Sequence, residues 1–170
     1  GTARGEAGGA HDAGRLRDGR RTPKPHAARK GKGAMPSVEL RGEPFTVADG
    51  YDKFWRKATA GRWEQATFEA ISRCVDADTV VLDIGAWIGP TVLYAARHAR
   101  RVEAFEPDPA SVAVLQQNLA LNPHVASKGR VHQNAGWTEA RSMAMGNRRN
   151  PGDSMSSLLE TGAAHTWTVE

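Results

Sequence analysis

A short apolar run, followed at once by a glycine-bounded turn, constrains the fold of this chain more than any other feature of its sequence. Residues Thr79–Asp83 read Thr-Val-Val-Leu-Asp, a continuous run that is typical of a parallel strand buried on both faces. Gly85–Gly89 follows as a turn, and Pro90 stands where the first residue of a helix belongs. The segment therefore predicts a strand, a tight turn and a helix.

The same pattern repeats along the chain. A second strand is predicted at Arg101–Phe105, and Asp108 then precedes Pro109 as the N-cap of a second helix. That helix should end by Asn122-Pro123, and Arg130–Gln133 can form a third strand. The order β-α-β-α-β with short connections predicts an α/β fold, in which a parallel sheet has right-handed crossovers and helices on both faces.

The periodic signal is weaker beyond residue 134. Candidate strands are present at Met143–Met145 and Thr166–Val169. A doubly wound sheet usually has about five or six strands. We therefore expect the fold to be truncated after the first three parallel strands plus a short insertion.

Charge and glycine content divide the chain into a basic head and a mildly acidic remainder. Residues 1–35 hold nine of the 23 Lys and Arg residues, three acids and eight of the 18 glycines, so their net charge is +6. Such a stretch buries too little apolar surface to offset its chain entropy, and we expect a disordered extension. It is the only candidate region for nucleic acid, which we do not expect as a partner because residues 36–170 carry a net charge of −2.

Residues 36–75 form a predicted lead-in segment before the strand pattern of residues 76–170. Four aromatic side chains of this segment are expected to pack in the core: Phe54, Trp55, Trp63 and Phe68. Trp63–Val75 predicts an amphipathic helix, on which Cys74 is expected to be a small buried side chain. Since it is the single cysteine, an internal disulfide is excluded. No apolar run approaches the length of a membrane span, so we expect no membrane partner and a cytoplasmic location.

Two acidic residues fall where the predicted strands end, which is where open α/β sheets bind ligands. Gly85 permits a tight turn and the close approach of a ligand to the backbone, and Gly89 is expected to let the helix start pack closely on the strand. Glu106 ends the second strand, 21 residues after Gly85, where a carboxylate can accept both hydroxyls of a ribose. This spacing indicates a ligand that contains a nucleoside.

The residues around the turn favour one class of nucleoside cofactor. A dinucleotide site normally contains G-x-G-x-x-G, but this turn has no second glycine two residues after Gly85. Trp87 would crowd a pyrophosphate, and Asp83 would repel it while suiting a cationic group. S-adenosylmethionine carries a sulfonium, an ammonium and no phosphate, so it fits the D-x-G-x-x-x-G pattern better. A nicotinamide-dependent oxidoreductase is the second enzymatic alternative.

Two stretches, Val81–Pro90 and Ala104–Pro109, resemble class I S-adenosylmethionine-dependent methyltransferases and, more narrowly, the FkbM-like family. The resemblance covers about residues 50–160, and Phe54-Trp55 and Trp63-Glu64 are similar to that family's lead-in helix. It implies a Rossmann-like methyltransferase sheet, of which residues 76–170 form the N-terminal, cofactor-binding part. It also implies S-adenosyl-L-methionine as the cofactor and O-methylation of a small-molecule or sugar hydroxyl.

The resemblance also implies roles for individual residues. Asp83, Gly85 and Ala86 would line the methionine moiety, and Glu106 would hold the ribose. Asn134 and Ala135, after the third strand, would border the adenine ring, and Glu64 would approach the methionine end. The full set of expected cofactor-binding residues is Asp83, Gly85, Ala86, Gly89, Glu106, Asn134, Ala135 and Glu64.

The FkbM-like family continues with a strand that carries a Lys-Ile-Asp-x-Glu-Gly-like motif, which the sequence up to Glu170 does not contain. An incomplete or non-catalytic cofactor-binding module is therefore an alternative to an active enzyme. No catalytic residue is assigned, although His132 and His165 are candidate bases for a hydroxyl acceptor. The six histidines show no metal-ligand spacing, so no metal is expected.

Overall fold

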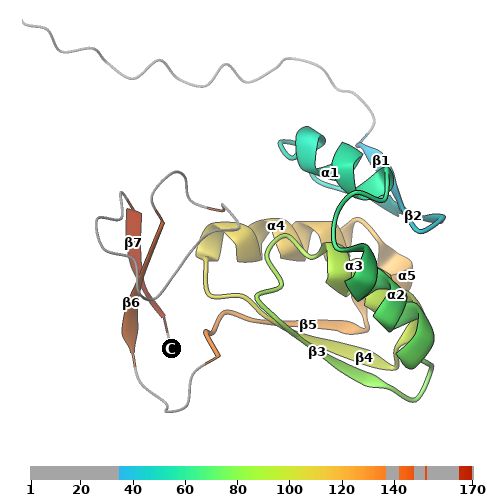
Figure 1. Ribbon diagram of the computed structural model, residues 1–170. Helices are drawn as coiled ribbons and strands as arrows, with labels where there is room; N and C mark the ends of the chain where they lie inside the picture. The colour runs from blue at the N-terminus through green and yellow to red at the C-terminus, as the bar shows by residue number, and fades with distance from the viewer. Residues whose placement is uncertain (1–34, 137–141, 148–151, 153–164, 170) are drawn as a thin grey trace, which may run out of the picture. The chain divides into compact units, whose positions relative to one another are not determined.

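A three-stranded parallel sheet forms the core of the α/β part of the chain. The computed structural model describes residues 35–136, 142–147, 152 and 165–169, so the expectation for the basic head lies outside the described residues. Strands β3 (Val80–Ile84), β4 (Arg101–Phe105) and β5 (Gly129–His132) lie in the order β3-β4-β5, and both pairs are parallel (Figure 1). The three predicted strands are confirmed, with β3 shifted by one residue toward the C-terminus and β5 by one residue toward the N-terminus.

The helices that follow the first two strands are also confirmed. Helix α3 spans Pro90–His98 and helix α4 spans Pro109–Ala120, each with a proline in its first turn. The Asp108 side chain caps α4 as predicted, because it accepts a hydrogen bond of 2.8 Å from the Ala110 N–H. A one-turn helix, α5 (Pro123–Ala126), then leads into β5. The buried apolar stripe of α4 includes Val112, Leu115 and Leu119.

The two faces of the sheet have different environments. Val102 and Ala104 are fully buried on the face that packs against α3, and α3 and α4 lie on the same side of the sheet (Figure 1). On the opposite face, Leu82 is 64% exposed and Ile84 is 71% exposed. The α/β fold is confirmed, but the described helices lie on one face of the sheet and not, as expected, on both. The expectation that Thr79–Asp83 is buried on both faces is therefore wrong. An apolar run shows that a strand is suited to burial, but it does not show whether any element covers its second face.

The lead-in segment contains a β-hairpin that the sequence analysis does not predict. Strands β1 (Ser37–Leu40) and β2 (Glu43–Thr46) pair in antiparallel fashion. Arg41 and Gly42 connect them, and both have positive φ, as in the type I′ turns that favour two-residue hairpins. The two strands have only four residues each, which is too short for a clear alternation of apolar and polar residues.

Two helices complete the lead-in segment. Helix α1 spans Asp52–Thr59 and helix α2 spans Gln65–Cys74. The predicted helix at 63–75 therefore starts two residues late, because Glu64 has a left-handed φ of 46°. The expectation that Cys74 is buried is wrong. Cys74 lies six positions after the buried Phe68, which places it on a different side of the helix.

The aromatic side chains of the lead-in segment pack as predicted. Trp55 and Phe68 are buried, and the Phe54 ring lies edge-on to the Trp55 and Trp63 rings, with centroids 4.9 and 5.0 Å away. The Phe54 ring also lies edge-on to the ring of Trp87, at 4.6 Å. The lead-in segment thus contacts the turn between β3 and α3.

The two weaker strand predictions are confirmed as well. Strands β6 (Met143–Asn147) and β7 (His165–Val169) form a separate two-stranded antiparallel sheet. The Trp167 indole N–H donates a hydrogen bond of 3.1 Å to the Pro107 carbonyl, which follows β4. This bond joins the small sheet to the end of the parallel sheet where the candidate site lies.

Two buried asparagines, Asn118 of α4 and Asn122 just before α5, attach the lead-in segment to the α/β part. The Asn118 side chain accepts a hydrogen bond from the Ala48 N–H at 2.7 Å and donates one to the Ile88 carbonyl at 2.8 Å. The Asn122 side chain bonds both backbone groups of Thr46, at 2.9 and 2.7 Å. Because these amides are almost fully buried, their pairing with backbone groups is required for stability.

We expect Asn118→Ala to destabilise the fold strongly. The substitution leaves the Ala48 N–H and the Ile88 carbonyl without their partner, which should lower the free energy of unfolding by about 2–4 kcal/mol. Urea denaturation followed by circular dichroism measures this change. The control is Gln116→Ala, an exposed position on the same helix, where a change within about 0.5 kcal/mol is expected. Equal effects of the two substitutions would contradict the role assigned to Asn118.

Candidate functional site

The turn between β3 and α3 lies at the carboxyl ends of the strands. Its backbone is left-handed at Gly85 (φ 82°), Trp87 (φ 50°) and Gly89 (φ 85°). The Gly85 and Ala86 N–H groups donate hydrogen bonds to the Phe105 carbonyl at the end of β4, at 2.8 and 3.1 Å. The turn is therefore held against the neighbouring strand end by its backbone.

The two glycines of the turn have different surroundings. A Cβ atom at Gly85 would meet nothing within 4 Å, so space beside this backbone is open to a ligand. A Cβ atom at Gly89 would overlap the Leu115 Cδ1 atom of α4. Gly89 was expected to allow close packing on the strand, but the close approach is to helix α4.

The Glu106 carboxylate joins the turn to the end of β4. Its Oε2 atom accepts a hydrogen bond from the Trp87 N–H, and its Oε1 atom accepts one from the Asp108 N–H, each at 2.8 Å. Glu106 is buried, and this burial raises the pKa of its carboxyl group despite the two backbone hydrogen bonds. Because each carboxylate oxygen has two lone pairs, each keeps one acceptor position after these bonds.

Asp83 lies one residue before the end of β3, on the face that packs against α3. Its Oδ2 atom accepts a short hydrogen bond of 2.5 Å from the Thr91 hydroxyl. Burial raises the pKa of the Asp83 carboxyl, and the hydrogen bond from Thr91 opposes that change. The charges of Asp108 and Asp83 also raise the pKa of Glu106, so the three carboxyl groups share one electrostatic environment.

Gly152 is bonded to both sides of the site through its backbone. Its N–H donates to Asp108 Oδ2 at 2.7 Å, and its carbonyl accepts from the Trp87 indole N–H at 2.8 Å. Gly152 has a φ of 81°, and a Cβ atom there would lie 3.0 Å from the Tyr51 hydroxyl. Together with Glu106, these residues form a closed circuit of hydrogen bonds around the strand ends. We refer to Trp87, Glu106, Asp108 and Gly152 as the strand-end circuit.

The structure brings five of the predicted cofactor residues together and places the others less directly. These five are Asp83, Gly85, Ala86, Gly89 and Glu106. Asn134 and Ala135 follow β5 and are half-buried, and the Glu106 N–H donates to the carbonyl of His132, two residues before Asn134. Glu64 is exposed, and its carboxylate accepts a hydrogen bond from Thr67 in the first turn of α2. No contact of the Glu64 side chain links it to the strand ends within the described residues.

The two candidate bases lie away from Asp83. His132 pairs with Phe105 in the sheet register, on the face opposite to α3, and its ring stacks on the Phe105 ring at 4.7 Å. Its Nε2 atom is 2.7 Å from Glu103 Oε2. This hydrogen bond holds the pKa of the Glu103 carboxyl below its ordinary value, although burial acts in the opposite direction. His165 is exposed at the start of β7.

Three residues with clear positions in the site are absent from the predicted cofactor-binding set. Gly152 and the indole of Trp87 act through contacts between residues far apart in the sequence, which local sequence patterns do not predict. Asn118, which holds the Ile88 carbonyl of the turn, did leave a signal. It is a polar residue on the same helix as the apolar stripe, one position before Leu119.

In the part of the chain that the structure describes, no helix has the length and apolar character needed to cross a membrane. Among the same residues, no group of three or more His, Cys, Asp or Glu side chains is arranged to hold a metal ion.

We expect alanine to cost much more at Gly89 than at Gly85. Both positions have left-handed φ, at which an alanine side chain is strained. Either substitution should therefore lower the free energy of unfolding by about 1–2 kcal/mol. Gly89→Ala adds the overlap with Leu115, and overpacking of this kind costs about 1–3 kcal/mol more. Urea denaturation of the two variants measures the difference. Equal stabilities would show that α3 and α4 adjust freely at this contact.

The comparisons with known proteins give structural likeness only. No protein-family model matches the sequence, and no curated protein matches it significantly. Similar solved structures include a protein from Streptococcus mutans, described as a candidate methyltransferase and solved in complex with SAH (13% identity, TM-score 0.39, covering 42% of this chain and 39% of that one). The M. jannaschii tRNA m1G37 methyltransferase is also similar (16% identity, TM-score 0.39, covering 62% of this chain and 31% of that one). So is wild-type Trm5b from Pyrococcus abyssi (15% identity, TM-score 0.37, covering 71% of this chain and 44% of that one). The chain spans less than half the length of each of these proteins.

Proposed function

We propose that this chain is the cofactor-binding part of an S-adenosylmethionine-dependent methyltransferase of the FkbM-like type. The observation that carries the proposal is the position of Asp83 and Glu106 at adjacent strand ends, on either side of the open backbone at Gly85. The acceptor is proposed to be a small-molecule or sugar hydroxyl, as the resemblance in sequence implies.

The charge of the site supports a cationic ligand over a pyrophosphate. Asp83, Glu106 and Asp108 are close enough for the first and last to raise the pKa of the Glu106 carboxyl. Among the described residues, the side chains of Asp83 and Glu106 are bonded to the Thr91 hydroxyl and to backbone N–H groups, and no Lys or Arg side chain is bonded to either of these two. A dianionic pyrophosphate would be repelled by such a group, whereas an ammonium or a sulfonium would be attracted.

The geometry of Glu106 supports recognition of a ribose. Its two oxygens already accept backbone N–H groups, and each has a further acceptor position. The vicinal 2′- and 3′-hydroxyls of a ribose present two donors with a matching separation. The two backbone bonds fix the carboxylate before the ligand arrives, so little side-chain entropy is lost on binding.

The residues of this chain would bind and orient the cofactor. S-adenosylmethionine, when bound, supplies a methyl group that positive sulfur has activated for in-line displacement. Asp83 would hold the ammonium of the methionine moiety, Glu106 the ribose, and Gly85 would let the ligand lie against the backbone. Alignment and exclusion of water are the main contributions that a protein makes to such a transfer. His132 lies on the face of the sheet opposite to Asp83, so we do not propose it as the base.

Ribose recognition is tested with two ligands and two variants. Unmodified chain should bind S-adenosylhomocysteine about ten times more tightly than its 2′-deoxyadenosine analogue, because a hydrogen bond to a charged group is worth about 1.5–3 kcal/mol. In Glu106→Gln this preference should fall to less than about threefold. Isothermal titration calorimetry measures all four affinities, and circular dichroism verifies that the variant is folded.

The matched control is Glu103→Gln. Glu103 lies on β4, three residues before Glu106, and its side chain is on the opposite face of the sheet. This variant should keep the full preference for the 2′-hydroxyl. A folded chain that ignores S-adenosylhomocysteine and binds NADH would refute the methyltransferase proposal in favour of a nicotinamide-dependent oxidoreductase.

The affinity for S-adenosylhomocysteine should depend on pH through Asp83. Burial raises the pKa of this carboxyl, and the ammonium of the ligand binds its ionised form. Affinity should therefore be full above the raised pKa and should fall as the pH is lowered through it. Asp83→Asn should bind about tenfold more weakly at neutral pH and should show a flatter pH profile. An unchanged profile in this variant would exclude Asp83 as the partner of the ammonium.

A further inference from the structure

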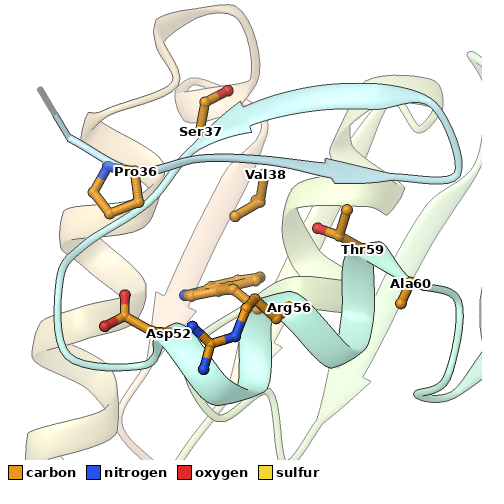
Figure 2. Close-up of a pocket in the computed structure, with 8 residues that line it drawn as sticks. Pro36, Ser37, Val38, Asp52, Arg56, Thr59 and Ala60 are labelled. Atoms are coloured by element: carbon orange, nitrogen blue, oxygen red, sulfur yellow. The ribbon is translucent and has the colours of Figure 1, made fainter.

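The hollow between strand β1 and helix α1 is an open depression in the surface of the lead-in segment. Figure 2 shows the side chains that line it, and five of them are exposed: Ser37, Asp52, Arg56, Thr59 and Ala60. Exposed polar side chains can satisfy their hydrogen bonds with water. The strand ends differ, because the Asp83 carboxylate there is half-buried and is held by a neighbouring side chain.

Thr91 is the side chain that holds the Asp83 carboxylate. It is the second residue of α3, after Pro90, and it is half-buried. Its hydroxyl donates to Asp83 Oδ2 at 2.5 Å. A length of about 2.5–2.7 Å is typical of a hydroxyl that is bonded to an ionised carboxylate. The bond joins the start of α3 to the end of β3, and Thr91 is not one of the predicted cofactor residues.

The two oxygens of this carboxylate have different surroundings. Oδ2 accepts the bond from Thr91, whereas Oδ1 has no hydrogen-bond or ion-pair partner among the described residues. Oδ1 is not one of the fully buried, unpaired polar atoms of this part of the chain, so solvent reaches it. Each oxygen of an ionised carboxylate has two lone pairs. Both lone pairs of Oδ1 are therefore open to a donor from a ligand.

The bond from Thr91 fixes the side-chain torsions of Asp83. Threonine is suited to this task because branching at Cβ restricts its own χ1 torsion. The backbone of Thr91 is set by the first turn of α3, in which the Leu93 N–H donates to the Gly89 carbonyl at 2.9 Å. Since the helix fixes Thr91 and Thr91 fixes Asp83, the position of Oδ1 is determined before a ligand arrives. Binding then costs less side-chain entropy.

The same bond stabilises the ionised form of Asp83. Burial raises the pKa of the Asp83 carboxyl, and the hydrogen bond from Thr91 acts in the opposite direction. The charged group that interacts with Asp83 from the end of β4 is Glu106, a second carboxyl. Without the Thr91 hydroxyl, burial and the like charge of Glu106 would both favour the protonated form of Asp83. A protonated carboxyl does not form an ion pair with a cation.

We propose that Thr91 is a positioning residue for the ammonium group of the ligand. Its hydroxyl holds the Asp83 carboxylate by Oδ2, so that Oδ1 accepts a hydrogen bond from that ammonium. Thr91 acts through Asp83 and supplies no contact of its own. This inference rests on the proposed function, because the ammonium belongs to the methionine moiety of the cofactor.

The test compares Thr91→Val, which lacks the hydroxyl but keeps the branched shape, with the unmodified full chain. In the ligand-free protein, the pKa of the Asp83 carboxyl is measured from the pH dependence of its carbon-13 resonance, and it should be higher in the variant. S-adenosylhomocysteine should bind about fivefold more weakly by calorimetry, because Asp83 must then be ordered on binding. Thr91→Ala should give the same changes, and Thr91→Ser should restore the pKa and most of the affinity.

The matched control is Thr79→Val, at the other end of β3. The Thr79 hydroxyl donates to Asp76 at 2.7 Å and lowers the pKa of that carboxyl. This variant should therefore raise the pKa of Asp76 and leave both the pKa of Asp83 and the affinity unchanged.

Two results would overturn the role of Thr91: an unchanged pKa of Asp83 in folded Thr91→Val and Thr91→Ala, or an unchanged affinity in both. A folded chain that does not bind S-adenosylhomocysteine would refute the methyltransferase proposal and, with it, the role toward the ammonium. The pKa of Asp83 is measured without ligand, so it would still show whether Thr91 holds this carboxylate. The two failures are therefore distinguishable.

Discussion

The two hydrogen bonds that the Glu106 carboxylate accepts are the constraint on which the rest of the strand-end region depends. They tie the Trp87 N–H of the glycine turn and the Asp108 N–H at the start of α4 to one side chain at the end of β4. The turn holds Trp87 at a left-handed φ that costs a non-glycine residue energy, and the bond from its N–H helps to offset that cost. A single acidic side chain thereby sets the relative positions of two connections in the fold.

The same side chain links the parallel sheet to segments far away in sequence. Asp108 and Trp87, both held by Glu106, bind the two backbone groups of Gly152. On the other side, the Trp87 ring meets Phe54 of α1, while Asn118 bonds the neighbouring Ile88 carbonyl. The lead-in segment, the parallel sheet and Gly152 therefore meet at one turn.

The parts of this arrangement that follow from local sequence could be predicted, and the parts that follow from tertiary contact could not. Strand β3 and the Asp108 cap were recognisable because an apolar run and an Asp-Pro pair act over a few residues. The exposure of Leu82 and the bonds of Gly152 depend on which distant elements are present and where they pack. Glu106 is intermediate: its spacing from the glycine turn was predictable, but its two backbone bonds were not.

Burial and the charges of Asp108 and Asp83 raise the pKa of Glu106, which means that its ionised form is less stable in the fold than in water. A cation bound beside Asp83 would reduce this repulsion, so the ligand would stabilise the protein as well as bind to it. Such a coupling connects the proposed cofactor to the fold through electrostatics rather than through shape. Because Glu106 also holds the Trp87 and Asp108 N–H groups, removing the ribose hydroxyl from the ligand separates recognition from structure better than replacing Glu106 does.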